Sequence, residues 1–172
     1  MDRNDVGTAS RRVVLCALLA AVMTALQAAM SPLPNIEPVS LLILVYTLVF
    51  GRQVFYIIYT FVFLEGLLYG FHLWWATYLY IWPLWALAVL LIGRSRELPP
   101  LVWAVASGAF GLSFGALDAI PYLVGGPAAA FSRWVAGIPF DLLHCGGNFF
   151  LALALEQPLY RALARARDRT GW

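Results

Sequence analysis

The chain has 172 residues, of which 62% are hydrophobic and 12% charged, and its formal net charge is +2. Soluble domains are about half apolar and a quarter charged, so this composition indicates an integral membrane protein. It leaves no room for a separate soluble domain, and so small a net charge gives no reason to expect a nucleic-acid partner. The sequence has no phosphate-binding loop ending in Lys-Ser or Lys-Thr, so any energy from ATP must come from a partner.

Apolar stretches between short polar breaks predict an all-α membrane protein, a single domain over residues 1–172 whose helices form a compact bundle. Six spans are predicted, followed by a basic tail: residues 13–30, 36–50, 54–70, 73–92, 101–124 and 132–155, then 158–172. Ser10-Arg11-Arg12 resembles a twin-arginine export signal, but the rest of the chain is equally apolar, so we expect residues 13–30 to be a first span.

The second span is short. Its apolar part, residues 39–50, has only 12 residues, roughly 18 Å of helix. The hydrocarbon core of a membrane is about 30 Å thick. Two interpretations remain open: the helix begins near Asn35 in the interface, or it is a partial span that other helices shield from lipid.

The chain contains eleven basic residues, all of them arginine. Ten lie at the two ends of the chain or in two short polar breaks: Arg3, Arg11, Arg12, Arg52, Arg94, Arg96, Arg161, Arg165, Arg167 and Arg169. If the chain crosses six times from a cytoplasmic N-terminus, these ten are cytoplasmic, as the positive-inside bias requires. The pattern therefore predicts a multi-pass protein of the bacterial plasma membrane with both termini in the cytoplasm.

Small residues recur at a spacing of four along the first predicted span: Ala17, Ala21, Ala25 and Ala29. Such a row lies on one helix face and permits the close approach of another helix. Packing within the bundle and docking on a separate membrane protein both remain possible explanations. The fifth span carries a similar row, for which packing within the bundle is favoured: Ser107, Gly111 and Gly115.

Polar residues inside the predicted spans gather in the outer half of the membrane under this threading, and we take them as candidate ligand contacts: Glu65, Asp118, Asp141, His144 and Asn148. The last three follow a spacing of three and then four, which places them on one helical face. An ionisable group at mid-membrane costs about 2.5–3.5 kcal/mol even on the lenient insertion scale. Several such groups are expected together only if they share a wet or ligand-filled cavity.

Aromatic residues near these positions complete the candidate substrate site: Tyr69, Trp74, Trp75 and Tyr122. They could stack on a flat ligand, although an interfacial aromatic belt would explain them almost as well. Under this threading the outer half of the membrane contains four acidic residues and a single arginine. This excess of acids favours a neutral or cationic ligand. The spacing of cysteines gives no metal motif, so neither a metal nor a cofactor is expected.

The chain resembles the substrate-binding S components of bacterial energy-coupling factor (ECF) transporters over nearly its whole length. The resemblance rests on size, on the six-span plan with a short second span, and on three stretches: the alanine row from Ala17 to Ala29, residues 33–39 with the apolar run to Gly51, and residues 137–148 with 158–160. S components are small six-helix membrane proteins that capture vitamins and related micronutrients.

The resemblance implies a receptor rather than an enzyme. The ligand is bound from outside in a cavity closed by outer loops, and the first span docks on a transmembrane coupling protein driven by two cytosolic ATPases. The S component then topples in the membrane and turns its cavity inward. The substrate is not named by the resemblance, so cobalamin, a thiamine-precursor pyrimidine, pantothenate and queuosine-type bases all remain open. Metal uptake is disfavoured, because the N-terminus lacks the histidine-bearing segment of the nickel and cobalt relatives.

Three other classes remain. A channel or a self-sufficient secondary carrier would transport without an ATPase partner. A six-span scaffold protein would carry its intramembrane acids without a ligand. An intramembrane aspartic hydrolase would pair Asp118 with Asp141, but the residues that flank these aspartates do not match the motifs of lipoprotein signal peptidases.

Overall fold

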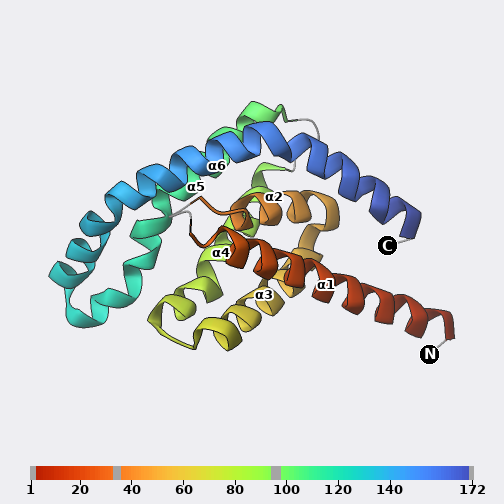
Figure 1. Cartoon of the computed structure of the whole chain (residues 1–172), viewed down its shortest axis with the longest axis horizontal. Coiled ribbons are helices and arrows are strands. Elements are labelled where there is room, and N and C mark those ends of the chain that lie inside the picture. Colours follow the sequence, from red (N-terminus) through yellow and green to blue (C-terminus); the bar gives the residue numbers. More distant parts are fainter. Residues whose placement is uncertain (1–2, 33–35, 94–97, 171–172) are drawn as a thin grey trace.

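A computed structural model describes residues 3–32, 36–93 and 98–170, and within these residues the chain is helical, without strands. The α-helices are α1 (Arg3–Met30), α2 (Val39–Phe50), α3 (Val54–Tyr69), α4 (Leu73–Ile92), α5 (Pro100–Asp118) and α6 (Pro127–Thr170). Two short 3₁₀ segments, η1 (Gly51–Gln53) and η2 (Ile120–Gly125), join α2 to α3 and α5 to α6. Figure 1 shows α5 and α6 running side by side along one edge of the molecule, with α2 to α4 packed beneath them.

The helices confirm an all-α protein of membrane-spanning character. In the described residues five stretches are long and apolar enough to cross a membrane: residues 10–30, 39–69, 73–92, 100–125 and 127–169. The six predicted spans divide the second of these stretches into two, at η1. There the chain reverses direction, because Gly51 adopts φ +58°, which an L side chain disfavours.

Helix α2 is buried on nearly every side. Of its 12 residues, only Leu48 is not fully buried, because α6, α4, α3 and α1 all pack against it. This is the arrangement expected of a partial span shielded by protein. The alternative start near Asn35 falls partly on residues 33–35, which lie outside the described part of the chain.

The helix ends near the C-terminus differ from the predicted bounds. Helix α5 stops at Asp118 rather than at residue 124, because Pro121 cannot donate an α-helical hydrogen bond and the chain continues as η2. Helix α6 begins at Pro127 and continues through Pro158, so residues 158–170 extend the last helix instead of forming a separate tail. Packing holds this extension in place: the Arg167 guanidinium donates to the Val49 carbonyl at 3.0 Å.

The glycine row of α5 packs against α6, as expected. A Cβ added at Gly111 would lie 2.7 Å from the His144 carbonyl, and one at Gly115 would meet the Asp141 carboxylate. The alanine row of α1 behaves in the opposite way. Its four members are exposed, whereas Ala20 and Thr24 on the adjacent face are buried. Packing within the chain therefore does not account for Ala17, Ala21, Ala25 and Ala29.

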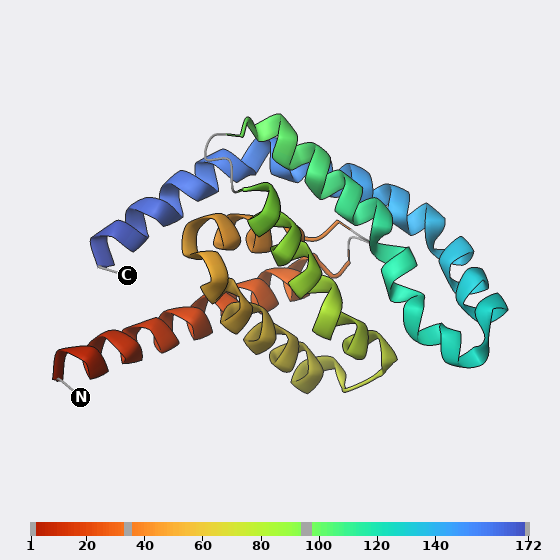
Figure 2. The ribbon, with the colours of Figure 1, turned by 180° about the vertical axis from the view of Figure 1, so that it is seen from behind.

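Both termini lie on one side of the molecule, and the α3–α4 and α5–α6 turns lie on the other (Figures 1 and 2). Arg11, Arg12 and Arg52 are exposed. Arg94 and Arg96 lie outside the described residues, and so does the side chain of Arg3.

Candidate ligand-binding site

A cavity of about 600 Å³ lies where α1, the α1–α2 segment and α3 to α6 converge. Its volume falls within the range of small-molecule sites, about 300–1,000 Å³. Its polar lining residues are Gln27, Ser31, Glu37, Glu65 and His144. Its aromatic lining residues are Tyr69, Trp74, Tyr78, Trp82 and Phe114. Met30 and Ile36 complete the wall. Every α-helix except α2 supplies at least one of these residues, so the cavity belongs to the whole bundle.

Glu37 joins the first connecting segment to the last helix. Its carboxylate accepts hydrogen bonds from the backbone N–H groups of Val39 and Ser40 and from the Ser40 hydroxyl, so it satisfies donors at the start of α2. Its Oε1 also lies 3.1 Å from Nε2 of His144. The two atoms lie within hydrogen-bonding distance, so the carboxyl group and the imidazole hold each other in place.

Glu65 lies in the opposite part of the wall and is joined to α1. The amide Nε2 of Gln27 donates to Oε2 of Glu65 at 3.1 Å. Glu65 is completely buried, and its other oxygen, Oε1, has no hydrogen-bond partner in the described structure. A buried acceptor without a partner costs free energy, and a ligand donor removes this cost.

The aromatic part of the wall is built around Trp82. The centroid of its ring lies 5.2 Å from that of Tyr78 and 5.6 Å from that of Phe114, and Tyr78 in turn lies 5.1 Å from Trp74 in an edge-on arrangement. Trp74, Tyr78 and Trp82 are spaced by four residues, so they share one face of α4. The ring of His144 packs 4.9 Å from Phe114, centroid to centroid.

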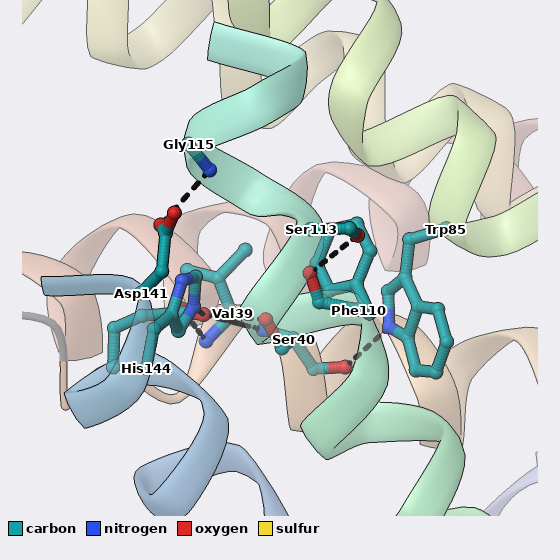
Figure 3. A network of polar contacts seen from close by, with 9 residues as sticks. Val39, Ser40, Trp85, Phe110, Ser113, Gly115, Asp141 and His144 are labelled. Carbon is teal, nitrogen blue, oxygen red and sulfur yellow. Dashed lines mark hydrogen bonds and ion pairs between the residues drawn. The ribbon is translucent and has the colours of Figure 1, made fainter. Parts of the chain in front are cut away.

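A second, smaller cavity of about 380 Å³ adjoins the first and shares Trp74, Tyr78 and Phe114 with it. Asp118 lines this cavity and accepts two hydrogen bonds on Oδ2 from Arg133, at 3.0 Å from Nε and 2.6 Å from the terminal nitrogen. Asp141 also lines it. The Asp141 Oδ1 accepts from the Gly115 N–H (Figure 3), at a distance of 2.9 Å, while its Oδ2 is buried and has no partner in the part of the chain that the structure describes.

The structure brings most of the sequence-predicted site residues together, in two groups. Glu65, Tyr69, Trp74 and His144 line the larger cavity, and Trp74, Asp118 and Asp141 line the smaller one.

Three predicted residues line neither cavity. Trp75 donates its indole N–H to the Val62 carbonyl at 2.8 Å and packs edge-on against Phe71. Tyr122 lies under the Arg133 guanidinium, 5.4 Å from ring centroid to carbon. Asn148 is buried one turn beyond His144, outside both walls.

Sequence reasoning left out eight of the residues that line the larger cavity: Gln27, Met30, Ser31, Ile36, Glu37, Tyr78, Trp82 and Phe114. Two of them carried a signal in the sequence. Tyr78 and Trp82 continue the spacing of four that starts at Trp74, so they could have been assigned to the same face of α4. Gln27 and Glu37 lie near the ends of predicted spans, and nothing in the local sequence ties them to Glu65 and His144.

No group of three or more histidine, cysteine, aspartate or glutamate side chains in the described residues is arranged to hold a metal ion. Compared with protein-family models, with curated proteins and with solved structures, the chain matches none of them. Within the described residues the protein is all-helical, with helices long and apolar enough to span a membrane and with a mixed polar and aromatic cavity.

Proposed function

We propose that this chain is the substrate-capture subunit, or S component, of an ECF-type importer in the bacterial plasma membrane. It binds a small, water-soluble vitamin or related micronutrient from outside the cell. The larger cavity carries this proposal, because it combines ligand-sized volume with buried hydrogen-bonding groups inside an otherwise apolar bundle. Such groups are expensive in a membrane unless they meet a ligand or water.

The proposed topology has six crossings and two cytoplasmic termini. It is supported by the position of both termini on one side of the molecule, opposite the α3–α4 and α5–α6 turns (Figure 1). It is also supported by the ten arginines at the ends and in two breaks. In this orientation the turns on the far side face the cell exterior, and the ligand enters from there.

The proposed partners are a transmembrane coupling protein and two cytosolic ATPases, since the chain itself carries no phosphate-binding loop. The alanine row of α1 supports a docking role. Its side chains are small and exposed, and they leave the α1 backbone open to close approach by another helix.

In a receptor the buried carboxylates of Glu65 and Asp141 serve ligand binding, whereas in a scaffold they serve assembly of the protein. The test is the double variant Glu65→Ala with Asp141→Ala, purified in detergent. For a receptor, the variant assembles but no longer retains the small molecule that the wild-type protein carries through purification, as measured by mass spectrometry. A variant that retains it, or a wild-type protein that carries none and gains no thermal stability from a micronutrient mixture, would rule out the receptor.

An aspartic hydrolase is not favoured by the geometry. A catalytic aspartate pair shares a proton between two free carboxyl groups. Here Asp118 is held by Arg133 through two hydrogen bonds, and one oxygen of Asp141 is held by the Gly115 N–H. We therefore propose binding without turnover.

A further inference from the structure

Four buried atoms on residues that line the larger cavity have no hydrogen-bond partner in the described part of the chain: Oε1 of Gln27, Oε1 of Glu65, Nε1 of Trp82 and Nδ1 of His144. Oε1 of Glu65 needs a donor, and the indole N–H of Trp82 needs an acceptor. Both side chains are almost completely buried, at 0% and 1% exposure, so water from the surface does not satisfy them. A ligand that fits this wall must present an N–H or O–H group and a separate lone pair.

The shape of the wall restricts the ligand further. Aromatic rings from α3, α4 and α5 line the cavity, and Trp74, Tyr78 and Trp82 pack edge-on against one another along one face of α4. Aromatic walls favour a planar ring that can stack or pack edge-on against them. A volume of about 600 Å³ corresponds to roughly twenty water molecules at their liquid volume, which suits a molecule with one or two rings.

The charge of the wall disfavours an acid as ligand. Its ionisable residues are two carboxylates and one histidine, and no arginine is among the lining residues that the structure describes. Arg133 lines the adjoining smaller cavity, and its guanidinium is already paired with the Asp118 carboxylate. An anionic group in the larger cavity would face Glu37 and Glu65 without a cation to offset them.

We propose that the larger cavity binds a planar, aminated nitrogen heterocycle, neutral or cationic, whose amino group donates to Glu65 and whose ring nitrogen or carbonyl accepts from Trp82. This assignment rests on the proposed receptor function and adds the chemical class of its substrate. His144 offers a further polar atom to such a ligand. Its Nε2 is paired with Glu37, and its Nδ1 is buried and has no partner among the described residues.

The first test uses the full chain purified from its membranes in detergent. The protein is denatured, and the released small molecule is analysed by ultraviolet absorption and mass spectrometry. The expected product is a heterocycle with an exocyclic amine. Release of pantothenate, a corrinoid or an aromatic acid would overturn the ligand class and leave the receptor standing. If nothing is released, the probes below decide.

The second test measures binding of named probes by calorimetry: cytosine, adenine and guanine against benzoate, nicotinate and pantothenate. Binding of one or more aminated bases, with no binding of the three acids, is the expected outcome. Preference for an acid overturns the inference. Failure of all six probes overturns the ligand class. The receptor function itself falls only if, in addition, no molecule is released and a micronutrient mixture gives no gain in thermal stability, so the two failures are distinguishable.

Two conservative variants then locate the contacts. Glu65→Gln keeps the size of the side chain, and Trp82→Phe keeps a flat ring without the indole N–H. Each is expected to weaken binding of the best base roughly tenfold or more by removing one hydrogen bond. Glu156→Gln and Trp134→Phe are the matched controls, because neither residue lines the larger cavity. Unchanged affinity in both cavity variants contradicts the assignment.

Discussion

Oε1 of Glu37 lies 3.1 Å from Nε2 of His144, a contact that joins residues 107 positions apart in the sequence. Through it the segment before α2 is attached to α6, across the larger cavity. The same carboxylate accepts from the first N–H groups of α2, so a single side chain connects the start of one helix, the middle of another and the wall of the site.

Replacing Glu37 is therefore expected to loosen the bundle as well as the site. Glu37→Ala leaves the first N–H groups of α2 and the His144 ring without their acceptor. Losing such a helix-start acceptor costs about 1–2 kcal/mol. Thermal unfolding in detergent checks this, with the milder Glu37→Gln variant expected to fall between Glu37→Ala and wild type. The exposed Ser31→Ala serves as the control, and a Glu37→Ala protein as stable as wild type contradicts the expectation.

The α5–α6 contact depends on the absence of a side chain at Gly111. Gly111→Ala places a methyl group against the backbone of α6, 2.7 Å from the His144 carbonyl, and overpacking of this kind costs about 1–3 kcal/mol. Gly146→Ala is the matched control on α6, because an added Cβ there meets nothing within 4 Å. Unfolding in a denaturing detergent should separate the two variants. Equal stability of the two variants would show that α5 and α6 can separate to accommodate the added methyl group at little cost.

Arg133 is expected to stabilise the outer part of the bundle through Asp118. Arg133→Ala leaves the buried Asp118 carboxylate with an unpaired oxygen, which costs about 1–3 kcal/mol. Adding Asp118→Asn should recover part of the loss, since the amide carries no charge. A double-mutant cycle measures the coupling, and Arg165→Ala, at the exposed far end of α6, is the control. Additive effects of the two changes would show that the pair contributes nothing.

The alanine row of α1 is expected to be required for docking. Ala21→Leu or Ala25→Leu adds bulk to an exposed helix face, so it should prevent co-purification with the coupling protein while ligand binding stays unchanged. Ala154→Leu, at an exposed position of α6, controls for the added bulk. If both α1 variants still co-purify at wild-type levels, the docking surface lies elsewhere.

Local signals in the sequence were enough to predict the helices and to predict those site residues that are ionisable side chains within apolar stretches. Glu65 and His144 stood out because an ionisable side chain in an apolar stretch needs a special reason. Their partners did not stand out. Gln27 reaches Glu65 across 38 positions and Glu37 reaches His144 across 107, and periodicity assigns a residue to a helix face without naming the helix opposite.

The prolines after α5 and within α6 show that local sequence alone does not predict where a helix ends. Pro121 ends α5, whereas α6 continues through Pro139 and Pro158. The residue type is the same, and the lost hydrogen bond is the same. The difference lies in the surroundings, because α6 is held along its length by α5 and α2 and at its end by the Arg167 contact with Val49. Only tertiary packing distinguishes a stop from a continuation.

The burial of α2 also sets an order for biogenesis. A segment of 12 residues is too short to anchor itself in the bilayer during synthesis, since a lone span needs about 20. Three of the four helices that pack against it, α3, α4 and α6, emerge from the ribosome later. Nascent chains arrested before Pro127 should therefore leave α2 open to proteases or labelling reagents, and completion of α6 should close that access. We therefore expect α2 to be stably inserted only after α6 has been synthesised.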